Sequence, residues 1–118
     1  MGFVIEMKNE AIMSFNIKNV EEILLTKLNN IANVVCRYHL NDDTISYTCL
    51  EKYDMESKIF VSLNCIIRIE DDECRVILVG AGKNGHLADL FMRPDKEFAL
   101  EAEKLLLENG FVRTSSFE

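Results

Sequence analysis

The segment Gly80–Gly85 reads Gly-Ala-Gly-Lys-Asn-Gly and matches the pattern G-x-G-x-x-G. In dinucleotide-binding proteins the glycines of this pattern let backbone N–H groups approach a pyrophosphate. Such a site also needs a parallel strand–helix–strand unit, with an acidic residue at the end of its second strand. Here the preceding strand belongs to an antiparallel hairpin, and only one convincing helix follows. The segment is therefore predicted to be a turn that uses glycine's freedom at positive φ, and no dinucleotide cofactor is expected.

Histidine and carboxylate side chains are the next candidates for chemistry. His39 and His86 lie far apart, and neither is spaced with further ligands as a metal site requires, so both are predicted to face solvent. Acidic residues gather at 42–43 and 70–73. The second group is suited to weak binding of a divalent cation, but it lacks the twelve-residue calcium pattern, and solvated turns are the favoured interpretation. We predict no catalytic residue and no metal site.

Four cysteines, Cys36, Cys49, Cys65 and Cys74, fall inside apolar runs. No Cys-x-x-Cys occurs, and the spacing matches no zinc pattern. Free thiols that pack as small core side chains are the favoured interpretation, with a disulfide framework as the alternative.

Length and charge restrict the class of protein. The chain has 118 residues, 48% of them hydrophobic, which is typical of a single globular domain over 1–118. Twenty acidic and 13 basic residues give a net charge of −7, which argues against nucleic acid and anionic membranes as partners. The sequence shows no membrane-spanning apolar run and no signal-peptide pattern, so a cytoplasmic location is expected.

Hydrophobic periodicity predicts the elements that position these residues. The predicted elements are strands at 11–17 and, more weakly, 1–8, a helix at 19–30 capped by Asn19, strands at 34–40, 44–49, 59–70 and 74–80, and a helix that begins at Pro94 and ends at Asn109-Gly110. Residues 51–58 are expected to form a connecting loop, and the tail from Phe111 is expected to be extended.

Apolar residues set the register of two predicted hairpins, because a slip of one residue would turn half of each pair outward. In the first hairpin the predicted inward pairs are Leu40 with Ile45, Tyr38 with Tyr47 and Cys36 with Cys49. In the second they are Ile69 with Cys74, Ile67 with Val76 and Cys65 with Leu78.

One fold satisfies all of these apolar faces. It is an α+β two-layer sandwich, in which an antiparallel sheet carries two helices on one face in the order β-α-β-β-β-β-α. The same order occurs in TATA-binding-protein-like, or helix-grip, folds, which is an analogy of topology. Such folds host DNA binding, lipid carriage and dimer modules, so the analogy selects no function.

The segment 50–55, Leu-Glu-Lys-Tyr-Asp-Met, precedes the long hairpin, and the glycine-rich turn and final helix follow it. Over residues 48–108 this arrangement resembles a family of short bacterial α/β domains that carry a tyrosine–methionine segment, a long hairpin and then a glycine-rich turn. The resemblance implies an α/β domain from a low-GC Gram-positive type of bacterium. It implies no activity, and no catalytic residue is carried over.

The face of the predicted sheet without helices carries Phe60, Ile66, Ile77 and Val79. Such an apolar patch is typical of a contact surface, so we predict a non-enzymatic interaction module that forms a homodimer through this face. In the competing arrangement residues 3–5 fold over that face and the protein stays monomeric.

Three other functions stay open. The first is a helix-grip carrier, in which the final helix stands off the sheet and encloses a small apolar ligand or a lipid. The second is an enzyme, for which no nucleophile–base pair, metal set or phosphate loop was found. The third is a regulatory partner of another protein. None of these functional hypotheses includes a cofactor.

Overall fold

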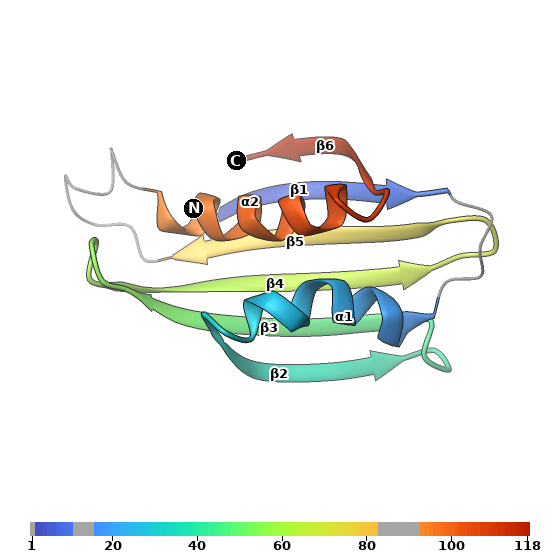
Figure 1. Cartoon of the computed structure of the whole chain (residues 1–118), viewed down its shortest axis with the longest axis horizontal. Coiled ribbons are helices and arrows are strands. Elements are labelled where there is room, and N and C mark those ends of the chain that lie inside the picture. Colours follow the sequence, from blue (N-terminus) through green and yellow to red (C-terminus); the bar gives the residue numbers. More distant parts are fainter. Residues whose placement is uncertain (1, 11–15, 83–92) are drawn as a thin grey trace.

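The structure is a computed structural model that describes residues 2–10, 16–82 and 93–118. Its elements are β1 (Gly2–Asn9), α1 (Ile17–Leu28), β2 (Asn33–Leu40), β3 (Ile45–Asp54), β4 (Ile59–Ile69), β5 (Cys74–Gly82), α2 (Pro94–Leu107) and β6 (Val112–Phe117). The six strands form an antiparallel sheet in the order β2-β3-β4-β5-β1-β6 (Figure 1).

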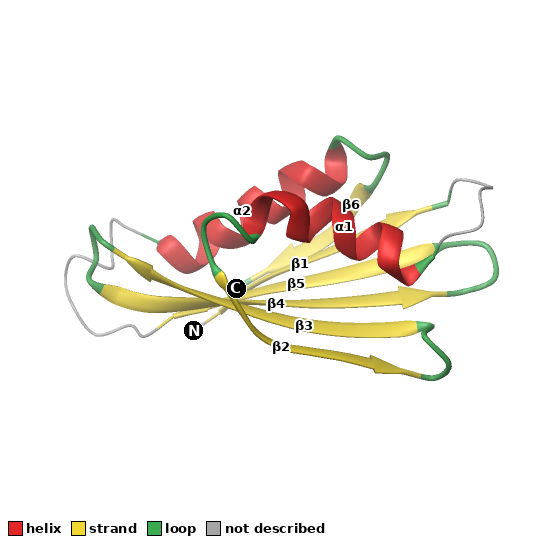
Figure 2. Ribbon diagram, turned by 60° about the horizontal axis from the view of Figure 1, so that its bottom comes forward, coloured by secondary structure: helices red, strands yellow, loops and turns green. Residues whose placement is uncertain are grey.

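Both helices lie on the same face of this sheet (Figure 2). The core between the layers is apolar, and its largest fully buried side chains include Phe98, Phe111, Ile5, Leu63 and Leu78. The predicted α+β fold with an antiparallel sheet and two helices is therefore confirmed, but the predicted order β-α-β-β-β-β-α lacks the sixth strand, β6, which follows α2 and pairs with β1. The finer likeness to TATA-binding-protein-like folds stays a prediction.

The β4–β5 hairpin follows the sequence pattern in both register and orientation. Its three predicted inward pairs are all present. Val61, Leu63, Cys65 and Ile67 of β4 are at most 1% exposed, and they point toward the helices. Burial of this continuous apolar row stabilises the fold at about 25 cal/mol per Å². The strand β5 continues to Gly82, two residues past its predicted end.

The β2–β3 hairpin has the predicted register but the opposite orientation. All three predicted pairs are present. However, the buried side chains of β3 are those of Ser46, Thr48 and Leu50. The residues of this strand that were predicted to face inward, Ile45, Tyr47 and Cys49, therefore point away from the helices. The physical reason is the buried carboxylate of Glu21 on α1, which forms hydrogen bonds with polar side chains of this hairpin. β3 also extends to Asp54, into the predicted loop.

The N-terminal segment forms a strand within the sheet. β1 pairs with β5 on one side and with β6 on the other. Phe3 and Ile5 are buried in the core beneath the helices. The competing arrangement, in which residues 3–5 cover the open side of the sheet, is therefore wrong. The tail is extended as predicted, and as β6 it is an edge strand of the sheet.

The two helices begin at different kinds of residue. Asn16 caps α1, and its side chain accepts a hydrogen bond of 2.8 Å from the Lys18 N–H, so the predicted cap at Asn19 is three residues too late. Of the predicted strand 11–17, Ile17 is the first residue of α1, and residues 11–15 lie outside the described part. Pro94 opens α2 as predicted. After α2, Gly110 adopts a φ of +89°, which favours glycine.

Candidate functional site

We call the side of the sheet away from the helices the open face. Directly paired residues share a face, so the strand registers assign its side chains. Its apolar members are Val4, Cys36, Tyr38, Leu40, Ile45, Tyr47, Cys49, Tyr53, Phe60, Ile66, Ile77, Val79, Ala81, Val112 and Phe117. Tyr38 and Phe60 are 57% and 60% exposed, which is unusual for large apolar side chains. The open face is therefore an apolar surface that extends over all six strands.

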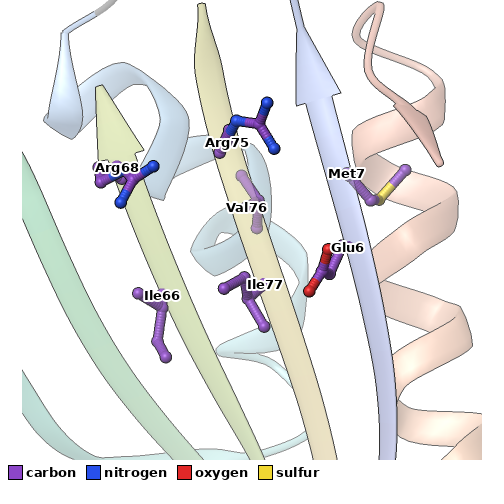
Figure 3. A pocket seen from close by; sticks show the side chains of 7 residues that line it. All are labelled: Glu6, Met7, Ile66, Arg68, Arg75, Val76 and Ile77. Atoms are coloured by element: carbon purple, nitrogen blue, oxygen red, sulfur yellow. The ribbon is translucent and has the colours of Figure 1, made fainter. Parts of the chain in front are cut away.

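The four residues of the predicted contact surface all lie on the open face. Ile66 pairs directly with Ile77 across β4 and β5 (Figure 3). Val79 follows two residues along β5. All three are half-buried by their neighbours. Phe60 lies nearer the far end of β4, where its ring contacts that of Tyr53 with 5.0 Å between centroids. The structure therefore joins Ile66, Ile77 and Val79 directly and sets Phe60 apart.

Positive charge on the open face is concentrated at one end of its strands. Arg68 pairs with Arg75, and Arg75 pairs with Lys8, so three cations lie in one row across β4, β5 and β1. The two arginines line a depression together with Ile66, Ile77 and Glu6 (Figure 3). Each cation forms an ion pair with an acidic residue two positions away in the sequence, just outside its strand; these residues are Glu70, Glu73 and Glu10. At the other end of the face lie Glu51 and the Tyr53–Phe60 pair.

A second cluster lies on the helix side, around Glu21 of α1, which is 1% exposed. Arg37 donates hydrogen bonds to both carboxylate oxygens, at 2.6 and 3.3 Å. Ser46 donates its hydroxyl at 2.5 Å, and His39 Nε2 lies 2.8 Å from the same carboxylate. The other ring nitrogen of His39 lies 3.0 Å from Asp43. His39 is thus held between two carboxylates, and its prediction as a solvent-facing residue without an acidic partner is wrong.

Titration in this cluster follows from its contacts. Burial alone would raise the pKa of Glu21, but the hydrogen bonds from Arg37, Ser46 and His39 lower it to about 2. The hydrogen bond with Glu21, and then the charge of Glu21 and the contact with Asp43, raise the pKa of His39 against the opposing effect of burial. Because the Ser46 hydroxyl donates to Glu21, Ser46 and His39 do not form a nucleophile–base pair. The arrangement binds β2 and β3 to α1, which is a structural role.

The Glu21 cluster was missed at the level of sequence, although one signal was present. The buried residues of α1 include Ile17, Glu21, Leu24 and Leu28, a spacing of four, three and four. A glutamate at a core position of a helix needs buried donors. Arg37, His39 and Ser46 stood on the non-apolar sides of two neighbouring strands and were the available donors.

The cysteines divide into two pairs. Cys65 and Cys74 are buried, and burial raises the pKa of each thiol to about 12. For these two, the prediction of free thiols in the core is confirmed. Cys36 is exposed and Cys49 is half-buried, so for Cys36 the prediction of a core position is wrong.

The glycine-rich segment does not form the turn that was predicted from its first residues. Gly80 and Gly82 belong to β5, and neither has a positive φ. A Cβ atom at Gly80 would lie 2.1 Å from the Asp95 backbone oxygen, so this glycine permits close packing of α2 on β5. Residues 83–85 and His86 lie outside the described part.

Among the described residues, no group of three or more His, Cys, Asp or Glu side chains is placed to hold a metal ion. The acidic residues 70–73 occupy the tight β4–β5 turn, where the Glu70 N–H donates to the Glu73 carbonyl at 2.8 Å. In the same described ranges, neither helix has the length and apolar character needed to cross a membrane.

No protein-family model matches the chain, and no curated protein matches it. The resemblance to short bacterial domains therefore stays a prediction. Among solved structures, the chain is similar to the Ran-binding protein Mog1p of Saccharomyces cerevisiae, with 15% sequence identity and a TM-score of 0.48. The similarity covers 92% of this chain, and the chain spans 66% of the Mog1p chain.

Proposed function

We propose that this protein is a non-enzymatic interaction module that forms a homodimer through the open face of its sheet. The observation that carries the proposal is the apolar row of Ile66, Ile77 and Val79 at the centre of the face opposite α1 and α2. Monomeric proteins rarely expose apolar patches of this extent, because burial is favourable at about 25 cal/mol per Å². A standard interface removes about 800 Å² per partner, which is a modest part of the 7201 Å² that the chain exposes.

The charge distribution favours one twofold arrangement. A twofold axis that runs along the strands would place the row of Arg68 and Arg75 against the same row of the second copy, which is repulsive. An axis that runs across the strands places this row over the opposite end of the partner's face. That end carries Glu51 and the rings of Tyr53 and Phe60, which attract guanidinium groups. The proposed dimer therefore stacks its sheets with the strand ends reversed.

The remaining parts of the proposal follow from charge and contacts. A net charge of −7 disfavours nucleic acid as a partner. The chemistry-bearing cluster around Glu21 is satisfied internally, which supports a module without catalytic activity. A cytoplasmic, bacterial origin and a helix-grip topology belong to the same proposal.

The runner-up is a carrier for a small apolar ligand beneath α2. At Gly80 the Asp95 backbone lies too close for even a methyl group, and Phe98, Ala99 and Ala102 of α2 are fully buried. These contacts seat α2 directly on the sheet and favour the dimer.

Native mass spectrometry of freshly purified protein separates the two functions. We expect a dimer in which each chain has its sequence mass. A monomer with the added mass of a small apolar molecule would support the carrier and contradict the proposal.

A charge swap tests the arrangement within the dimer. Arg68→Glu and Glu51→Arg should each weaken association. The axis across the strands places β4 over the partner's β4, and Glu51 lies on the neighbouring strand β3, so each change brings like charges together across the interface. The double variant should recover part of the loss. Double-variant association no stronger than that of the weaker single variant would reject the reversed stacking while leaving the dimer itself standing.

A further inference from the structure

Two cysteines face each other across the β2–β3 hairpin. Cys36 pairs directly with Cys49, next to an irregularity in the register of β2. Directly opposed residues of an antiparallel pair have Cα atoms about 4.5–5.5 Å apart. This separation lies within the range of about 4.4–6.8 Å that a disulfide spans. Both side chains are on the open face, and both are free thiols in this structure.

The Cys36 thiol is close enough to affect the pKa of Cys49. Burial raises the pKa of Cys49, a hydrogen bond with Tyr47 opposes this rise, and the neighbouring Cys36 thiol adds to it. Cys36 is exposed, so a reagent in solution reaches it first. The other two cysteines are shielded, since Cys65 and Cys74 are at most 1% exposed. Their opposed positions and their exposure to solvent thus distinguish Cys36 and Cys49 from the two buried cysteines.

The pair lies at the least protected edge of the fold. β2 is an edge strand, bonded within the sheet to β3, and His39 is the one residue of β2 that is not exposed. On the helix side, Arg37 and His39 tie β2 to Glu21. On the open face, Cys36 is where a covalent bond would fix β2 to β3.

We propose that Cys36 and Cys49 are a redox-active pair that forms a reversible cross-strand disulfide when a low-molecular-weight disulfide oxidises the folded chain. The Cys36 thiolate attacks one sulfur of the reagent, forms a mixed disulfide and releases one thiolate. The Cys49 thiolate then attacks the Cys36 sulfur and expels the second reagent thiolate. The two cysteine protons leave on the two released thiols. The cysteine pair loses two electrons, and the reagent disulfide gains them.

The consequence is an edge strand whose attachment depends on redox state. In the reduced chain β2 is held by backbone hydrogen bonds and the Glu21 cluster. In the oxidised chain a covalent bond also closes the hairpin, which restricts its unfolded state. The proposal does not depend on the dimer, because β2 is the edge strand of the sheet, two strands away from the Ile66–Ile77 centre of the proposed interface, and a bond within one chain is read from that chain's mass.

The test treats the folded, reduced protein with glutathione disulfide and then blocks the remaining thiols. In the wild type we expect the chain to lose two hydrogen atoms, peptide mapping to join Cys36 to Cys49, and dithiothreitol to reverse the change. Cys65 and Cys74 should stay reduced and serve as internal controls.

Two variants define the order of the steps. Cys49→Ser should accumulate a glutathione adduct on Cys36, because the second attack is lost. Cys36→Ser, at an exposed position, should remain folded and form no internal link. A wild type that stays unreacted or stops at the glutathione adduct would overturn the proposal. So would a link that involves Cys65 or Cys74, or one that joins two chains.

Discussion

The two long hairpins of this sheet, β4–β5 and β2–β3, present opposite kinds of side chain to the helices. In β4–β5, the helices cover a row of apolar side chains, including Leu63 and Ile67. In β2–β3, α1 instead covers a polar group, where Arg37, His39 and Ser46 surround Glu21. The apolar row of β2–β3 then lies on the open face.

The difference shows that alternation fixes a register but does not choose which face a helix covers. The register depends on matching side chains between two strands. The covered face depends on what the helix brings, and α1 brings a carboxylate at a core position. The same choice enlarges the apolar open face, since Tyr38 and Tyr47 are turned onto it. A buried polar cluster on one side thus accounts for part of the apolar open face on the other.

The largest effect is expected within the apolar hairpin. Ile67→Asp should unfold the domain, because it buries an unpaired charge at a position that is 1% exposed. The cost is several kcal/mol against a total stability of roughly 5–15 kcal/mol. Circular dichroism during urea titration measures it. Arg68→Asp, one residue further on and exposed, should be far milder. Equal losses at both positions would mean that the faces of β4 are assigned wrongly.

The polar hairpin should fail through its carboxylate. Glu21→Gln removes the charge that Arg37 and His39 share, and it should lower the free energy of unfolding by about 3 kcal/mol. Glu22→Gln is the matched control, because Glu22 is the adjacent acid and is exposed. Urea titration at neutral pH measures both. If the two variants lose the same stability, the Glu21 cluster does not hold this hairpin.

The seat of α2 on the apolar hairpin gives a third, smaller effect. Gly80→Ala places a Cβ atom against the Asp95 backbone, so α2 must shift, at a cost of about 2 kcal/mol. Gly82→Ala should cost less, since its nearest neighbour is the Val61 side chain at 3.0 Å. Thermal unfolding compares the two. A smaller loss for Gly80→Ala than for Gly82→Ala would refute the close approach of α2.

The smallest effect is a pH dependence confined to the polar hairpin. Because its contacts raise the pKa of His39 in the fold, protonated His39 stabilises the protein below its unfolded pKa. This contribution is lost as the pH rises through the folded value. Glu21 remains ionised there, since its pKa is about 2. The wild type should therefore exceed His39→Gln in stability by more at about pH 5 than at about pH 9. A difference that grows with pH would reverse the assignment.

The features of this fold that depend on interactions between neighbouring residues were the ones that the sequence predicted correctly. The β4–β5 register, the Pro94 start and the Gly110 end were predictable, because each depends on neighbouring residues. The orientation of β2–β3 was not, since it depends on Glu21, which lies in another element. The role of Gly80 was likewise hidden, because its reason is a helix that begins 14 residues later. Of the contact surface, the face of Ile66 and Ile77 was predicted, but its extension over β2 and β3 was not.

Sedimentation equilibrium at micromolar concentration tests the central claim most directly, that the open face is a contact surface. The wild type is expected to have the mass of two chains, and Ile66→Lys the mass of one, because the lysine enters the centre of the proposed interface. Leu107→Lys is the matched control, since Leu107 is 49% exposed on α2, on the other side of the sheet, and this variant should remain a dimer. A wild type with the mass of one chain, unchanged by Ile66→Lys, would contradict the claim.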